Sequence, residues 1–191
     1  MKPGHVASQH AEELDPLWVF GYGSLMWNPG FTPAERIVAE LSGYARSFCM
    51  RSIHHRGTPQ QPGLVLALDE APAARCRGLA FRVRDAERRA VLDELRAREL
   101  ISSAYLERVL SVRLADGRAV AAVVYVVDRD HVQYCGGLAL EEQARIIARA
   151  VGGRGPNTEY LYNTAAHLEE LGIEDRSLSW LAARVRAIAG V

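Results

Sequence analysis

The segment Ala119–Val127 (AVAAVVYVV) restricts the fold more than any other part of the chain, because it is apolar on both of its faces. A strand of this kind lies in a sheet that is covered on both sides. It follows Tyr105–Leu114, another segment rich in β-forming residues, after the pair Asp116-Gly117. An Asp-Gly pair between two strand segments is typical of a hairpin turn. The sequence therefore predicts an antiparallel sheet with Ala119–Val127 as a central strand.

The other segments place most strands before most helices. Further strands are predicted at residues 17–25, 36–50, 64–68 and 78–83, with a polar loop at 54–63. A helix is predicted from Asp85, a candidate N-cap, to about Glu99, with Val91, Leu92 and Leu95 on one apolar stripe. Helical segments follow at residues 140–151, at 157–171 with Asn157 as N-cap, and from 177 to the end. Because strands and helices do not alternate, this order favours an α+β fold with a mainly antiparallel sheet or barrel.

The composition is that of an ordinary globular protein. The 191 residues include 23 basic and 23 acidic side chains, and this balance argues against non-specific binding to nucleic acid or membranes, which needs a basic surface. The length suits a single domain at residues 17–191, including the C-terminal helices, after a disordered tail at residues 1–16. The sequence has no apolar run long enough to span a bilayer, and the polar first sixteen residues lack the apolar core of a signal peptide. We therefore expect a cytoplasmic monomer.

The cysteines and histidines do not indicate a metal site. Cys49, Cys76 and Cys135 are odd in number and show no Cys-x-x-Cys spacing, which favours buried free thiols in a reducing compartment. A cysteine nucleophile stays an open alternative, although a buried thiol is the commoner role. His54 and His55 are adjacent, so they would face opposite sides of a strand, and we interpret them as loop residues. No metal and no cofactor is predicted.

The segment Gly21–Met26 (GYGSLM) is a candidate binding loop. It resembles the start of a dinucleotide-binding G-x-G-x-x-G motif, but Met26 replaces the third glycine and a turn follows where a helix should begin. Ser24 also lacks the G-x-S-x-G context of a hydrolase nucleophile. A strand that simply turns explains the glycines equally well. Alternatively, the glycines let the backbone approach a ligand, and successive N–H groups surround an anion or an oxyanion.

Two other features have ordinary explanations when the residues are taken alone. Glu99 is expected at the end of a helix, where a glutamate is usually a solvated surface group. The glycine-rich segment Gly152–Gly155 lacks the Gly-Lys-Ser/Thr ending of a phosphate-binding loop, and we interpret it as a linker between helices.

Five blocks of residues nevertheless occur in a characteristic order. They are Val19–Trp27 (VFGYGSLMW), Gly43-Tyr44 with Arg46-x-Phe48, His55–Pro59 (HRGTP) with Pro62–Leu64 (PGL), Arg98-Glu99 with Tyr105, and Asn157–Leu161 (NTEYL). Together they resemble the ChaC family of γ-glutamylcyclotransferases over roughly residues 17–172. The spacing between Glu99 and Tyr105 is longer than in the short-loop members and resembles that of bacterial members.

This resemblance implies a γ-glutamylcyclotransferase-like fold, a small and mainly antiparallel β-barrel with flanking helices. It implies that the γ-glutamyl group of glutathione cyclises to 5-oxoproline and releases Cys-Gly, without a metal or cofactor. By matching position, Glu99 is the catalytic acid and base, and the substrate-binding residues are Gly21, Tyr22, Gly23, Ser24, Leu25, Met26 and Tyr160. Arg46 and Arg56 are candidates for binding a substrate carboxylate. Two alternatives remain open, a cyclotransferase for other γ-glutamyl amines or amino acids, and a non-catalytic protein that binds glutathione or regulates cation transport.

Overall fold

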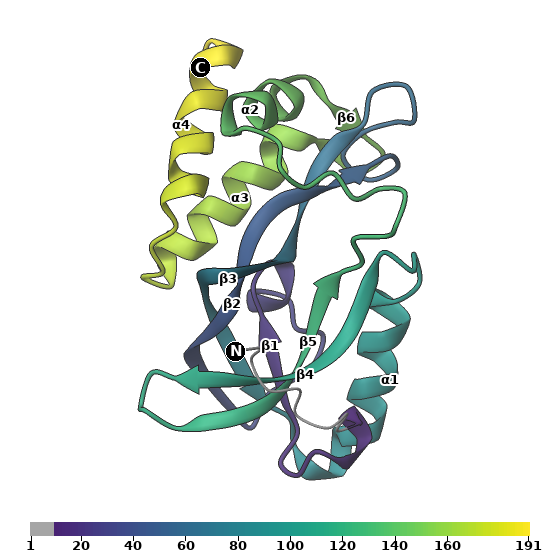
Figure 1. The fold of residues 1–191 in the computed structure, drawn as a ribbon, viewed down its shortest axis with the longest axis vertical. Helices are drawn as coiled ribbons and strands as arrows, with labels where there is room; N and C mark the ends of the chain where they lie inside the picture. Colours follow the sequence, from purple (N-terminus) through teal and green to yellow (C-terminus); the bar gives the residue numbers. More distant parts are fainter. Residues whose placement is uncertain (1–9) are drawn as a thin grey trace. The chain divides into compact units, whose positions relative to one another are not determined.

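The computed structural model describes residues 10–191, and within them the chain forms a closed five-stranded barrel and four α-helices (Figure 1). The strands are β1 (Trp18–Gly21), β2 (Glu35–Ser52), β3 (Gly63–Arg82), β4 (Tyr105–Leu114) and β5 (Ala119–Val127). The helices are α1 (Arg88–Glu99), α2 (Leu140–Arg149), α3 (Asn157–Glu170) and α4 (Arg176–Ala189). The predicted α+β class, with a small, mainly antiparallel β-barrel and flanking helices, is confirmed.

The strand order in the barrel is β1-β3-β2-β4-β5, and the pairings of β1 with β3, β2 with β4 and β4 with β5 are antiparallel. The pairing of β1 with β5 is parallel, with Trp18 opposite Ala122, and it closes the barrel. The β4–β5 hairpin runs in register from Tyr105 opposite Val127 to Arg113 opposite Ala119. Because β5 lies between β1 and β4 and is buried from Ala122 onward, the predicted central strand is confirmed.

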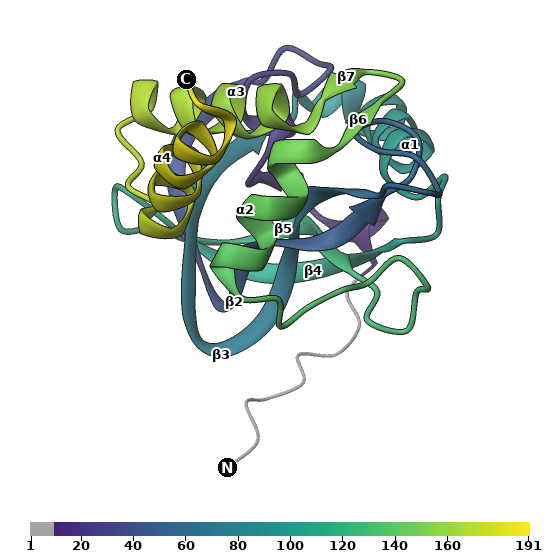
Figure 2. The same ribbon diagram turned by 90° about the horizontal axis from the view of Figure 1, so that it is seen from above.

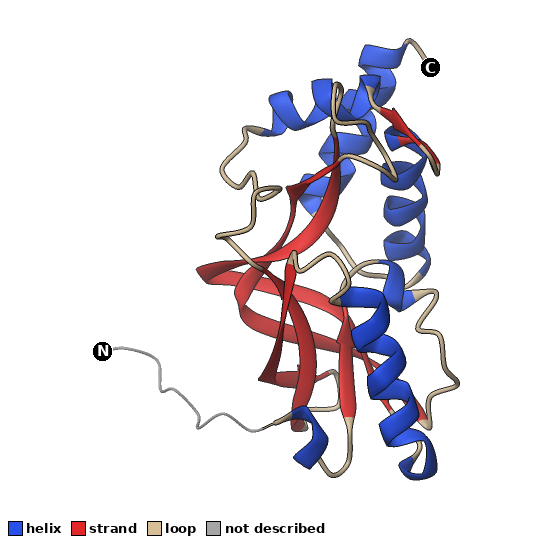
Figure 3. Ribbon diagram, turned by 90° about the vertical axis from the view of Figure 1, so that its right-hand side faces the viewer, coloured by secondary structure: helices blue, strands red, loops and turns tan. Residues whose placement is uncertain are grey.

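The described residues divide into two compact units. The first comprises residues 10–45 and 70–128, and its core lies between α1 and the barrel strands (Figure 3). Val91, Leu92 and Leu95 of α1 are buried in one cluster with Val19 of β1 and Val123 of β5. Each of these side chains is at most 5% exposed, so the predicted apolar stripe of α1 is confirmed.

The N-terminal segment departs from the prediction of a tail at residues 1–16. Residues 1–9 lie outside the described part of the chain. Residues 10–16 contain a 3-10 helix, η1 (Ala11–Glu13), and the side chains of Ala11 and Leu14 are buried in the cluster that packs α1. The prediction is corrected for residues 10–16, because two apolar side chains in a polar segment suffice to hold one turn against the core.

The second unit comprises residues 46–69 and 129–191, and α2, α3 and α4 pack against one another in it (Figure 2). Between α2 and α3, a two-stranded hairpin of β6 (Val151–Gly152) and β7 (Gly155–Pro156) replaces the predicted linker. Gly155 has a φ of +101°, a conformation that glycine adopts without strain and that allows the chain to reverse here.

Three local predictions are wrong for a physical reason. The two short strands predicted at 64–68 and 78–83 are one strand, β3, because strand pairing overrides the low β-propensity of the intervening charged residues, alanines and proline. Asp85 is not the N-cap of α1, since a 3-10 helix, η3 (Asp85–Glu87), precedes it and Glu87 occupies the cap position. Asn157 is the first helical residue of α3 rather than its N-cap, and its side chain bonds to β3 instead.

Candidate active site

The loop after β1 forms the first part of the candidate site, and it lies in the first unit. Gly21 ends β1 opposite Leu79 of β3, and after Tyr22 and Gly23 a 3-10 helix, η2 (Ser24–Met26), begins. The neighbouring Gly78 lies so close that a Cβ there would stand 2.2 Å from the carbonyl oxygen of Gly21. A side chain at Gly78 would therefore push β3 away from the start of the loop.

The backbone of this loop presents hydrogen-bond donors. The N–H of Met26 donates to the carbonyl of Gly23 at 2.9 Å, which closes the single turn of η2. The N–H groups at the start of a helical turn have no partner inside that turn. In the described part of the chain, the N–H groups of Gly23, Ser24 and Leu25 bond to no protein acceptor. Tyr22, Leu25 and Met26 are buried and anchor the loop, while Ser24 is exposed.

Glu99, the predicted acid and base, is the last residue of α1. Its side chain is only 18% exposed, so the expectation of a fully solvated helix-end group is wrong. Burial raises the pKa of the Glu99 carboxyl above its ordinary value, and the charge of Arg98 opposes this effect. A carboxyl with a raised pKa holds and releases a proton closer to neutral pH than a solvated glutamate does.

Arg98 connects the loop to Glu99. Its Nη2 donates to the Oγ of Ser24 at 3.0 Å, and its Nη1 donates to the carbonyl of Asn28 at 2.7 Å. Its Nε lies 3.3 Å from Oε1 of Glu99. The fold thus brings Ser24 and Glu99, which are 75 positions apart in the sequence, to the same guanidinium.

Tyr160, the remaining predicted site residue, belongs to the second unit and lies in the first turn of α3. Its hydroxyl accepts a hydrogen bond from the N–H of Leu66 at 3.2 Å, and its ring packs edge to face on Phe48 with centroids 6.0 Å apart. The guanidinium of Arg56 lies 5.7 Å from the centroid of the same ring. These contacts fix the orientation of Tyr160, and its contact with substrate stays a prediction.

The two arginines considered for a substrate carboxylate make contacts within the second unit. Arg46 is 3% exposed and forms an ion pair with Asp175 at 2.9 Å, at the start of α4. Arg56 donates to the carbonyl of Pro156 at 3.1 Å, and its side chain is 15% exposed. Both therefore have structural roles. His54 and His55 are exposed loop residues, as predicted.

Residues 17–188 match the protein family described as ChaC-like protein. The chain belongs to this family. It is 38% identical over 173 residues to the glutathione-specific gamma-glutamylcyclotransferase of Escherichia coli (strain K12), covering 91% of this chain and 74% of that relative. It is 35% identical to gamma-glutamylcyclotransferase 2-3 of Arabidopsis thaliana, covering 90% of this chain and 89% of the relative.

A solved structure supports the same assignment. The crystal structure of a yeast gamma-glutamyl cyclotransferase specific to glutathione superposes with a TM-score of 0.79 and 25% identity, over 90% of this chain and 96% of that chain. The ChaC resemblance and the γ-glutamylcyclotransferase-like fold that the sequence motifs implied are therefore both confirmed.

Near Glu99, the ChaC-like chain contains a polar network that the sequence analysis did not predict. The hydroxyl of Tyr125 on β5 donates to Oε2 of Glu107 on β4 at 3.1 Å, and Arg96 holds the same carboxylate through two hydrogen bonds of 2.7 and 2.9 Å. Burial raises the pKa of Tyr125, and the charges of Glu107 and Glu99 raise it further. The signal was Tyr125 itself, the one side chain with a polar group in the strand AVAAVVYVV.

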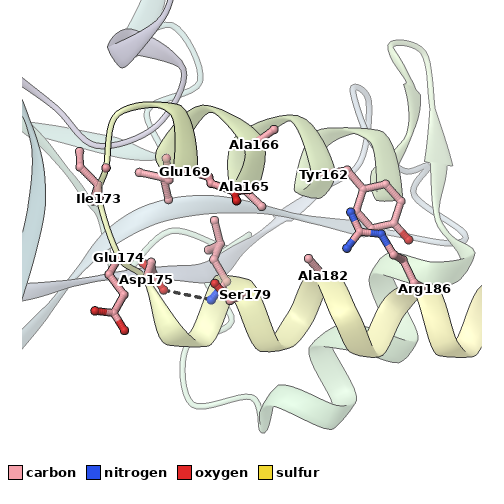
Figure 4. Close-up of a pocket in the computed structure, with 13 residues that line it drawn as sticks. Tyr162, Ala165, Ala166, Glu169, Ile173, Glu174, Asp175, Ser179, Ala182 and Arg186 are labelled. Atoms are coloured by element: carbon pink, nitrogen blue, oxygen red, sulfur yellow. Dashed lines mark hydrogen bonds between the residues drawn. The ribbon is translucent and has the colours of Figure 1, made fainter.

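The second unit of the ChaC-like chain contains a pocket of about 480 Å³ between α3 and α4 (Figure 4). The lining residues are Tyr162, Ala165, Ala166, Leu168, Glu169, Gly172, Ile173, Glu174, Asp175, Leu178, Ser179, Ala182 and Arg186. The guanidinium of Arg186 covers the ring of Tyr162 at 4.7 Å, and the Asp175 carboxylate is paired with Arg46. None of the predicted site residues lines this pocket.

The cysteines of the ChaC-like chain are free, as predicted. Cys49 and Cys76 are buried, whereas Cys135 is partly exposed. Burial raises the pKa of the Cys49 thiol to about 12, which makes it a poor nucleophile. Within residues 10–191, no helix is long and apolar enough to cross a membrane.

Proposed function

We propose that this chain is a γ-glutamylcyclotransferase that cleaves glutathione to 5-oxoproline and Cys-Gly. The observation that carries the proposal is the buried carboxyl of Glu99, held by Arg98 beside the donor-rich loop at Gly21–Met26. A relative at 38% identity that bears the name glutathione-specific gamma-glutamylcyclotransferase supports glutathione as the substrate.

The reaction is an internal aminolysis. The α-amino nitrogen of the γ-glutamyl group attacks the γ-carbonyl carbon and closes a five-membered ring, and the bond from that carbon to the cysteine nitrogen then breaks. Because nucleophile and carbonyl belong to one molecule, a folded-back conformation supplies a high effective concentration. The binding loop would hold the substrate in this conformation.

In this proposal Glu99 moves the proton. The α-amine is largely protonated at neutral pH, so its proton must be removed before or during the attack, and the leaving nitrogen must receive one afterwards. A single carboxyl performs both transfers in turn if its pKa lies nearer to neutral than usual. The burial of Glu99 changes its pKa in this direction.

The loop supplies the second requirement, a group of donors for the negative charge on the tetrahedral intermediate. The N–H groups of Gly23, Ser24 and Leu25 and the hydroxyl of Ser24 are the donors that we assign to it. Loss of one such donor typically costs about 3 kcal/mol of transition-state stabilisation. We assign substrate contacts to Gly21, Tyr22 and Met26 in the same loop, and to Tyr160 as a further contact.

We also propose that residues 17–191 act as one domain and that the chain works as a cytoplasmic monomer on a small molecule, without nucleic acid or membrane. The equal numbers of acidic and basic side chains support the absence of nucleic-acid and membrane binding, because a protein that binds either of these negatively charged partners needs a basic surface. Sedimentation of the purified chain, with and without DNA or anionic vesicles, tests it.

The function itself is tested by incubating the purified chain with glutathione and measuring 5-oxoproline and Cys-Gly. Equal amounts of both products are expected. A parallel reaction with γ-glutamyl-alanine separates glutathione specificity from a broader cyclotransferase, since the broader enzyme would turn over both. A thermal shift with glutathione but no 5-oxoproline would contradict the proposal and identify a non-catalytic binding protein.

A further inference from the structure

We propose that Arg98 is the positioning residue of this active site, the side chain that fixes the position of the binding loop relative to Glu99. This inference rests on the proposed function and deepens it. Its basis is that all three guanidinium nitrogens have a separate partner, the Glu99 carboxylate for Nε, the Asn28 carbonyl for Nη1 and the Ser24 hydroxyl for Nη2.

The geometry explains why an arginine is needed here. Arg98 lies in the last turn of α1. Its two loop partners are Ser24, the first residue of η2, and Asn28, two residues after the end of η2. A guanidinium is a planar, rigid fork with five N–H donors, so it fixes the directions of several partners at once. An ammonium group is a single point charge and cannot span the same three acceptors.

The bond to Ser24 determines what this hydroxyl can do. Its oxygen accepts a hydrogen from Nη2 of Arg98, so the hydroxyl hydrogen remains available for another acceptor. Ser24 is exposed, in contrast to its neighbours Leu25 and Met26. Arg98 therefore orients the Ser24 hydroxyl as a donor toward a bound molecule. Arg98 is also the residue directly before Glu99, the proposed base.

The charge of Arg98 also acts on Glu99. The groups that face the Glu99 carboxyl are Arg98 on α1 and Tyr125 on β5, and behind Tyr125 the Glu107 carboxylate on β4 is held by Arg96. Arg98 stabilises the ionised carboxylate, whereas burial favours the neutral acid. Because the Arg98 side chain is 34% exposed, solvent screens the pair, and we assign positioning as its larger contribution.

Two substitutions separate charge from positioning. Arg98→Lys keeps the charge but loses the fork, and Arg98→Met removes both while keeping the length of the aliphatic stem. Arg89→Met, on an exposed position of the same helix, is the matched control. For each variant, kcat and KM for glutathione are measured across pH, and the titration of the Glu99 carboxyl is followed by carbon NMR, which needs no activity.

With Arg98→Met we expect a higher pKa of Glu99, a shift of the acid limb of kcat/KM to higher pH, and a loss of kcat/KM of roughly 100-fold. With Arg98→Lys we expect a Glu99 pKa near that of the wild type but a kcat/KM still reduced about 30-fold, because the loop is no longer held. In both variants the amide resonances of Gly23 and Ser24 should move, and in Arg89→Met they should not.

The inference is overturned if Arg98→Lys has the kcat/KM of the wild type, which would leave charge as the whole effect, or if the loop amides do not move in either variant. These outcomes differ from failure of the proposed function. If the wild-type chain releases no Cys-Gly, the function is wrong, and the NMR measurements still decide whether Arg98 holds the loop.

Discussion

The side chain of Asn157 forms two hydrogen bonds to the backbone of Leu64, accepting from its N–H at 2.7 Å and donating to its carbonyl at 2.8 Å. Asn157 is fully buried in the second unit, and its carboxamide pairs with β3 as a neighbouring strand would. Backbone groups of a buried strand require such partners. The first residue of a helix thus completes the hydrogen bonding of a strand 93 positions earlier in the chain.

Asn157→Ala should therefore destabilise the protein. The change leaves the N–H and carbonyl of Leu64 buried without partners, and we expect the free energy of unfolding to fall by about 2–4 kcal/mol. Urea unfolding monitored by circular dichroism measures the change. Asn163→Ala, at an exposed position of the same helix, is the control and should stay within about 0.5 kcal/mol of the wild type. Equal stabilities for the two variants would contradict this role of Asn157.

Glu99→Gln should preserve the fold and remove the proton transfer. A carboxamide has nearly the same shape as the carboxyl but neither accepts nor releases a proton at neutral pH, so we expect a loss of kcat of roughly 100- to 10,000-fold. Release of Cys-Gly from glutathione measures it, with Glu94→Gln on the exposed face of α1 as the control. Near-normal turnover of Glu99→Gln would assign the base to another group.

The same variant should change how stability depends on pH. The pKa of Glu99 is raised in the folded protein, so between its unfolded and folded values the folded state binds more protons than the unfolded state. The stability that this group contributes is thus present below the unfolded pKa, near 4.5, and is lost as pH rises through the folded pKa. The melting temperature of Glu99→Gln, relative to the wild type, should accordingly increase as pH rises from 4 to 8. A constant difference would contradict the raised pKa.

Alanine substitutions at two glycines should affect different properties, the stability at Gly78 and the KM for glutathione at Gly23. In Gly78→Ala the new Cβ would lie 2.2 Å from the carbonyl oxygen of Gly21, so β1 and β3 must separate, and we expect a loss of stability of about 2–4 kcal/mol. At Gly23 a Cβ meets no atom within 4 Å, so Gly23→Ala should fold normally. The methyl group would then occupy space beside the proposed binding loop, and we expect it to raise KM for glutathione. Thermal unfolding and steady-state kinetics separate the two effects, and a Gly23→Ala variant with unchanged KM would place the substrate elsewhere.

The features of the fold that depend on local patterns were predictable from the sequence. β4 and β5 have the predicted bounds, because an Asp-Gly turn and a doubly apolar strand are both local signals. The unbroken course of β3 was not predictable, since its middle residues have low β-propensity and pairing within the barrel overrides that preference.

For the candidate site, the difference between local and distant information is larger. The glycines of the loop suggested a capacity for binding, but Glu99 gained a role only through the family resemblance, because its burial depends on residues far away in the chain. The contacts of Arg98 with Ser24 and Asn28 join positions 74 and 70 residues apart, and no spacing rule in a single sequence indicates such a contact.

The N-terminal turn η1 bears on where this protein can be shortened. The region shared with the family begins at residue 17, yet Ala11 and Leu14 are part of the core beneath α1, and Glu12 forms an ion pair with Arg96 at 2.6 Å. A chain trimmed to the shared region would lose Ala11 and Leu14 from the cluster in which Val91, Leu92 and Leu95 of α1 are buried. The segment that precedes the family match thus supports the helix that carries the proposed catalytic residue.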